Sequence, residues 1–210
     1  MYLVHKDKFF LRIIYLFTGL MIAAFGVELM LQSKLGLYSF GVLYTGLEKL
    51  TKINYGHIVQ IACLLWIVVA YIMGLKPSLA TIIDMLFFGW FLNHITAWSI
   101  IPGANHYLQE LLYLITGLFI FSFGIVFYLK ADLGAGPHDG LMVVLVKQTR
   151  KSIKVVKTSL DAVLLISGVL LGGVIGVGTV ISTLFQGYII DKLFLVVRLP
   201  GLEPGKITQP

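Results

Sequence analysis

The stretch ADLGAGPHDG at 131–140 interrupts a largely apolar chain and holds two acids, a histidine, three glycines and a proline. Gly134 and Gly136 can adopt positive φ, so a helix is expected to end here. Pro137 suits the first position of a following helix, and Asp139 complements the positive end of that helix. The stretch therefore predicts a break between two helices.

Two interpretations of this break remain open. In the first, it is a well-made turn that binds nothing. In the second, the exposed amides at 136–140 form an anion-binding nest, or His138 and Asp139 bind a cation or relay a proton. The predicted substrate-binding residues of this segment are Gly134, Gly136, Pro137, His138 and Asp139.

Three more residues complete the predicted binding site. Glu28 lies in a long apolar window without a basic neighbour at helical spacing, which makes it a candidate buried functional acid. Thr81 and Thr179 are expected at two equivalent helix starts, where they are predicted to line a central site. Asp84 and Asp161 are expected near interfacial water, and Asp161 follows a lysine by four residues, a spacing that allows a helix-face ion pair.

Catalytic signatures are missing from the sequence. It contains no H-E-x-x-H, no P-loop and no G-x-S-x-G. We therefore predict no catalytic residue, no metal and no cofactor, and the chain is not expected to be an enzyme.

The elements that position these residues follow from the composition. Of 210 residues, 58% are hydrophobic and only 12% charged, and the mean hydropathy is +0.93. Soluble domains carry about twice that charged fraction. The chain is predicted to be an all-α membrane protein, with six windows near the roughly 20 residues that span a bilayer: Phe9 to Leu31, His57 to Leu75, Leu79 to Ile101, Tyr107 to Leu129, Val155 to Leu171 and Val177 to Val197.

An internal repeat runs through the chain at an offset of 98 residues. From Tyr15 to Asn93, 21 of 79 aligned positions are identical without a gap, and they include several glycines and threonines. Duplication is the predicted origin of this pattern. The expected organisation is one membrane domain at 1–210, with repeat one at about 9–101, repeat two at about 107–197 and a polar C-terminal tail at 198–210.

The break at 131–140 has a counterpart in the first repeat, SKLGLYSFGV at 33–42. Each break precedes an apolar piece of about a dozen residues, which reaches only about 18 Å as a helix. We predict about six transmembrane helices plus two short broken or re-entrant helices. Three spans per repeat would invert the second copy relative to the first. In the alternative topology each short piece is a full span. Each repeat then has four spans, and the two copies have the same orientation in the membrane.

The basic residues indicate orientation. The net charge is +6, and a six-span topology places thirteen basic residues on the side of the N-terminus and only Lys34, Lys49 and Lys52 on the other. This favours cytoplasmic termini in a multi-pass plasma-membrane protein. The expected partners are the lipid bilayer, anionic lipid head groups and an unknown small solute or ion. A homo-oligomer is compatible with the sequence, and nucleic acid is not expected.

The motifs of the second half resemble those of a known family. ADLGAGPHDGLM, followed by KVVKT and then GGVIGVGT, resembles the YczE/YyaS/YitT group of bacterial integral membrane proteins from about residue 11 to residue 195. The resemblance implies a small, duplicated protein of the bacterial membrane. Members of the group usually carry a Pro, aromatic, Asp triplet in the first repeat as well, where this sequence has Ser39, Phe40 and Gly41. Glu28 is a candidate to compensate for the missing acid.

Two functional hypotheses follow. The leading one is a transporter or permease for a small solute, with its site between two inverted repeats. The alternative is a non-transporting membrane scaffold, or a regulatory or assembly partner, that acts through the basic segment KQTRKSIKVVK at 147–157.

Overall fold

The computed structural model describes residues 8–134, 136–151 and 153–197. The elements in this part of the chain are helices, which confirms the all-α prediction. The predicted polar tail at 198–210 lies outside the described residues. The helices are α1 (Phe9–Ser33), α2 (Ser39–Thr51), α3 (Tyr55–Ile72), α4 (Leu79–Ala97), α5 (Tyr107–Leu129), α6 (Pro137–Thr149), α7 (Ile153–Leu170) and α8 (Val177–Val196).

Among the described helices, five are long and apolar enough to cross a membrane, namely α1, α3, α4, α5 and α8. They match five of the six predicted windows. The sixth window corresponds to α7, which also has 18 residues. Its first half carries Lys154, Lys157 and Asp161, so α7 is a more polar helix than the other five.

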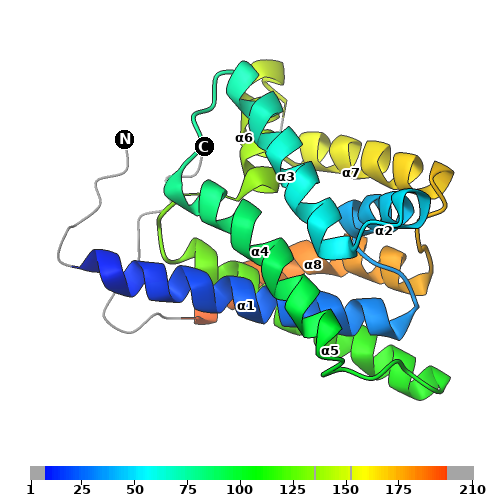
Figure 1. Cartoon of the computed structure of the whole chain (residues 1–210). Helices are drawn as coiled ribbons and strands as arrows, with labels where there is room; N and C mark the ends of the chain where they lie inside the picture. Colours follow the sequence, from blue (N-terminus) through cyan, green and yellow to red (C-terminus); the bar gives the residue numbers. More distant parts are fainter. Residues whose placement is uncertain (1–7, 135, 152, 198–210) are drawn as a thin grey trace.

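The most extensive helix–helix contact of the described residues is that of α1 and α5, which run side by side in Figure 1. Their backbones approach closely at glycines. A Cβ built on Gly19 would lie 2.9 Å from the carbonyl oxygen of Gly124, and one built on Gly117 would lie 2.8 Å from that of Gly26. The order of these contacts makes the two helices antiparallel. Small residues at such a crossing permit the close packing on which helix association in membranes depends.

The two short helices, α2 and α6, have 13 residues each, which corresponds to about 20 Å, less than the roughly 30 Å of a bilayer core. Each follows a break that contains a glycine with positive φ, at +108° for Gly36 and +116° for Gly134. A Cβ at either position would collide with the start of a long helix of the other half, at Thr179 for Gly36 and at Ser78 for Gly134. Glycine at both breaks therefore has a structural reason.

Hydrogen bonds fix each break to the opposite half. The carbonyl oxygen of Leu35 accepts from Gly178 N at 2.8 Å, and that of Leu133 accepts from Ala80 N at 3.4 Å. Thus the break before α2 docks on the start of α8, and the break before α6 docks on the start of α4. The two halves exchange equivalent contacts.

The packing of α3 against α4 differs from the packing of the corresponding helices, α7 and α8, in the other half. The helices α3 and α4 touch through their backbones at Gly56 and Gly89, and Gly56 N donates to Asn93 Oδ1 at 3.1 Å. In contrast, α7 and α8 form no comparable contact over the described residues, and nothing lies within 4 Å of a Cβ built on Gly187. The α7–α8 side of the bundle is therefore the looser one.

Candidate functional site

A cavity of about 190 Å³ lies at the junction of the two halves. Seven of the helices described above contribute to its walls, and many of the lining side chains are apolar. Its titratable or hydrogen-bonding side chains are Tyr38, Ser39, Asp84, Tyr128, His138, Lys157, Asp161, Thr183 and Gln186. This volume is smaller than the roughly 300–1,000 Å³ of pockets that hold drug-sized ligands, so the space suits a smaller solute.

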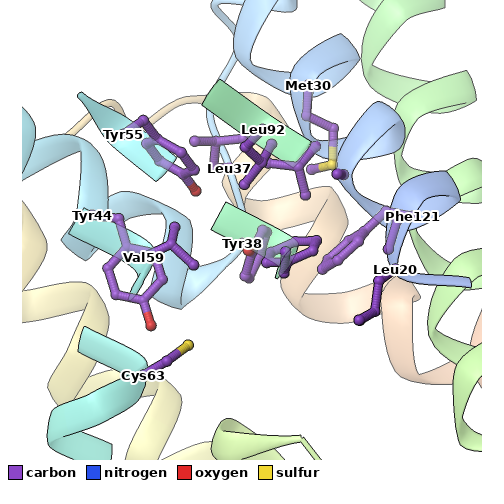
Figure 2. Close-up of a cluster of buried hydrophobic side chains, with 14 of the residues drawn as sticks. Leu20, Met30, Leu37, Tyr38, Tyr44, Tyr55, Val59, Cys63, Leu92 and Phe121 are labelled. Atoms are coloured by element: carbon purple, nitrogen blue, oxygen red, sulfur yellow. The ribbon is translucent and has the colours of Figure 1, made fainter. Parts of the chain in front are cut away.

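The two short helices bring their starts together at this cavity. Phe40, at the start of α2, lies edge-on to the imidazole of His138, at the start of α6, with 4.2 Å between ring centroids. These residues are separated by the repeat offset of 98. Figure 2 shows a second part of the same region, where Tyr38 lies beside Phe121 and Leu20. The cavity is thus bordered by both breaks.

His138 is oriented by a chain of hydrogen bonds. Its Nε2 lies 2.5 Å from the hydroxyl oxygen of Tyr44, and that oxygen accepts from Trp66 Nε1 at 3.1 Å. The indole N–H can only donate, so the hydroxyl proton of Tyr44 remains available for His138. The role of Trp66 in this chain of hydrogen bonds is visible only in the structure.

Asp84 is the buried acid of the cavity. A Cβ at Gly136 would collide with its Oδ2 and lie 3.0 Å from the Tyr128 hydroxyl oxygen. The carboxylate of Asp84 therefore lies against the backbone at the start of α6, where the helix presents partial positive charge. Asp84 is buried within the protein, because α4 packs against α1 and α6 and covers it.

An ion pair on α7 forms another wall. Lys157 Nζ lies 3.0 Å from Asp161 Oδ2, and the lysine side chain is 51% exposed whereas the aspartate side chain is 15% exposed. The predicted helix-face pair is confirmed. Both residues line the cavity, so the basic segment at 147–157 reaches the site with its last residue.

The predicted residues of the break divide into different roles. Gly134 has the expected positive φ, whereas Gly136 has a φ of −66°. For Gly136 the expectation of positive φ is wrong, and a Cβ there would displace the Asp84 carboxylate. Pro137 occupies the first turn of α6 as predicted. The side chain of Asp139 lies outside the described residues.

Thr81 and Thr179 perform matching structural tasks. Thr81 Oγ1 accepts from Ser78 N at 3.0 Å at the start of α4, and Thr179 Oγ1 accepts from Gly176 N at 3.3 Å at the start of α8. Neither belongs to the cavity lining. The predicted equivalence of the two helix starts is present, and the cavity is reached one turn further along, by Asp84 and Thr183.

Glu28 is buried and is not brought to the cavity. Its Oε1 accepts from Gln32 Nε2 at 2.7 Å and its Oε2 from Thr96 Oγ1 at 2.6 Å. The second of these bonds joins α1 to the end of α4. The carboxylate therefore forms a polar cross-link, and the acids that line the cavity together with His138 are Asp84 and Asp161.

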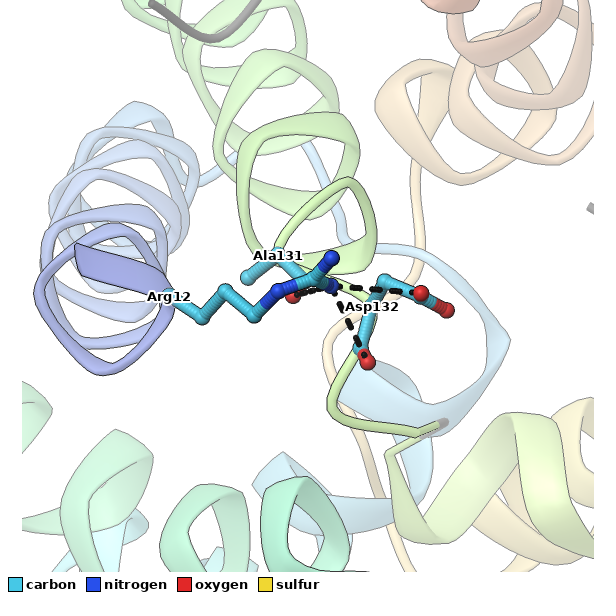
Figure 3. Close-up of polar contacts among 3 residues, drawn as sticks. All are labelled: Arg12, Ala131 and Asp132. Carbon is cyan, nitrogen blue, oxygen red and sulfur yellow. Dashed lines mark hydrogen bonds and ion pairs between the residues drawn. The ribbon is translucent and has the colours of Figure 1, made fainter. Parts of the chain in front are cut away.

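The opposite end of α1 is tied to the second break. Figure 3 shows Arg12 pointing at Asp132 and at the carbonyl oxygen of Ala131. Its Nη1 lies 2.9 Å from that oxygen and 3.2 Å from Asp132 Oδ2. The guanidinium thereby holds the end of α5 against α1.

No metal centre is evident in the described part of the chain, where no three His, Cys, Asp or Glu side chains gather in a way that could hold an ion. The groups in the cavity can instead bind a solute by hydrogen bonds, by charge and by aromatic contact.

The fold and cavity define a helical membrane protein, and comparison with known proteins gives its family. The model of a family of unknown function, DUF6198, matches residues 10–194, and the chain belongs to that family. An uncharacterized protein of Haemophilus influenzae is 31% identical over 91% of this chain and 87% of its own. The uncharacterized membrane protein YczE of Bacillus subtilis is 26% identical over 88% and 86%.

A third relative is the uncharacterized protein YyaS of Bacillus subtilis, which is 26% identical over 93% of this chain and 98% of its own. These matches confirm the resemblance to the YczE and YyaS proteins. No solved structure matches the chain.

Proposed function

We propose that the protein is a permease for a small solute and not an enzyme, and that the cavity between its halves is the solute site. The observation that carries the proposal is the placement of charged and polar side chains from several helices around 190 Å³ of space inside an apolar bundle. Ionisable groups are costly at membrane depth and are retained there mainly for function. A scaffold would not need them at the junction of both short helices.

Equivalent helix positions support a plan of two inverted repeats. The helices α2 and α6 begin and end 98 residues apart, and so do α3 and α7. The helices α1 and α5, which occupy equivalent positions in the two halves, pack antiparallel. The two halves are therefore oriented in opposite directions. Secondary transporters with inverted repeats bind substrate where broken helices meet, which is the position of this cavity.

The unequal helix pairs support alternating access. The closed pair, α3 and α4, meets near the end of α1 that holds Glu28, because Thr96 of α4 bonds to that residue. In the other half, α8 ends toward the part of α1 that holds Arg12, since Val197 after α8 packs against Val126 of α5. In the proposed mechanism, the α3–α4 side is closed while the α7–α8 side is open. With cytoplasmic termini in a bacterial plasma membrane, the cavity would open to the cytoplasm.

A flux assay tests the proposal. The purified chain, reconstituted into liposomes, is supplied with radiolabelled tetramethylammonium, glycine, methylphosphonate or erythritol, which are small probes of different charge. We expect at least one to enter faster than into protein-free liposomes. Entry of none of the four at a protein-dependent rate contradicts the proposal and favours the scaffold alternative, in which the segment at 147–157 recruits a partner.

A further inference from the structure

We propose that the cavity takes a small monovalent organic cation, a compact ammonium compound, and that Asp84 supplies its counter-charge. The inference rests on the proposed function of the cavity as a solute site. It follows from the charges, the rings and the volume of the lining.

The charges of the described lining residues sum to one negative charge. Among these residues, the carboxylates are Asp84 and Asp161, and the only lysine or arginine is Lys157. Lys157 lies 3.0 Å from Asp161, so these two charges offset each other. The net charge of the lining is therefore that of the Asp84 carboxylate.

His138 need not supply a compensating positive charge. The Tyr44 hydroxyl accepts from Trp66, so its own proton can be donated to His138 Nε2. With that donation, Nε2 carries no proton and the imidazole is neutral.

Aromatic rings form much of the remaining wall. Tyr38, Phe40, Phe88, Phe121 and Tyr128 all line the cavity and come from α4, from α5 and from the start of α2. The faces of aromatic rings attract cations, and cages of such rings recognise quaternary ammonium groups. The pairing of several rings with one carboxylate suits a cation that also has an apolar surface.

An anionic solute fits this cavity less well. The positive end of α6 is its most obvious attraction for an anion, yet the Asp84 carboxylate already lies against the backbone there, at Gly136. An anion at that place would meet a like charge at short range, which is unfavourable in a medium of low dielectric constant.

Three molecules of similar branched shape test the charge preference. The full chain in detergent is equilibrated with radiolabelled tetramethylammonium, and unlabelled tetramethylammonium, pivalate or neopentyl alcohol is added as competitor. We expect saturable binding that tetramethylammonium displaces, with pivalate and neopentyl alcohol at least about tenfold weaker, a difference of ~1.4 kcal/mol. Equal competition by pivalate or by neopentyl alcohol would overturn the inference.

Variants test the role of Asp84. Asp84→Asn should weaken tetramethylammonium binding at least about tenfold, whereas Asp84→Glu, which keeps the charge, should retain most of it. Glu28→Gln is the matched control, since it removes a buried carboxylate outside the cavity and should leave the affinity unchanged. Unchanged binding by a folded Asp84→Asn variant contradicts the inference. The competition experiment needs no variant, so it decides the matter if Asp84→Asn does not fold.

The outcomes separate this inference from the proposed function. Saturable binding of labelled pivalate or neopentyl alcohol without binding of tetramethylammonium overturns the cation and leaves a solute site in place. No saturable binding of any of the three overturns the cation inference, and the flux assay then judges the permease independently.

Discussion

Replacement of Gly187 by tryptophan is expected to stop solute movement without unfolding the protein. Gly187 lines the cavity, and nothing lies within 4 Å of a Cβ built on it. An indole at this position is expected to extend into the open space beside Gly187 and to obstruct the cavity. Since the space is empty of protein atoms, the change in the free energy of unfolding should stay within about 1 kcal/mol. Flux of whichever probe the wild type moves should fall at least about tenfold, which corresponds to ~1.4 kcal/mol.

The control for this variant is Leu184→Trp. Leu184 lies one turn earlier on α8, is 68% exposed and does not line the cavity. Its indole should face lipid, so flux should stay near the wild-type value. Normal flux in Gly187→Trp, or an equal loss in both variants, would argue against the cavity as the solute path.

Replacement of Gly26 by valine is expected to prevent stable folding. A Cβ at Gly26 would collide with the backbone nitrogen of Phe121 and lie 2.8 Å from the carbonyl oxygen of Gly117. Backbone atoms cannot rotate away, so α1 and α5 would have to separate along the most extensive helix–helix contact of the described residues. The cost should be ~3 kcal/mol or more. Size-exclusion chromatography and thermal unfolding in detergent measure the loss.

Met21→Val provides the comparison on the same helix. Met21 is 49% exposed, so the variant should elute and unfold like the wild type. A monodisperse Gly26→Val protein with an unchanged unfolding temperature would contradict the close approach of the two helices.

Much of the fold follows from periodicity and length. Long apolar runs specify helices because no other regular element except a closed barrel satisfies its backbone within a bilayer. The repeat offset places both short helices correctly, since the shared Leu–Gly pairs at 35–36 and 133–134 mark the breaks. The sixth predicted window, α7, is less apolar than the other five. Its first half carries Lys157 and Asp161, which line the cavity.

The site was only partly predictable, because each break packs against a helix start of the other half and not of its own half. The first break, at 33–42, contains no acidic residue, so the sequence points to Glu28 as the nearest acid. The structure instead brings Asp84, from the first turns of α4, to the second break, at Gly136. The separation of these two residues along the chain is not the repeat offset, so sequence distance gives no signal for their pairing.

The contacts between the halves also bring both breaks to the same cavity, so a polar side chain from only one break reaches it at this contact. His138 of the second break meets Phe40 of the first, not another histidine. The cavity thus has an aromatic contribution from α2 and a polar one from α6. With two identical polar breaks, two imidazoles would meet at this contact.

A single cavity that opens in turn to each side of the membrane should be reachable from both sides. This is tested by a membrane-impermeant maleimide on Thr183→Cys in a Cys63→Ala background, in right-side-out and inside-out vesicles. Thr183 lines the cavity. We predict reaction from both faces, with the faster rate from the face that holds the N-terminus, as the α3–α4 and α7–α8 pairs close in turn. Complete reaction from one face with none from the other would contradict alternating access through this cavity.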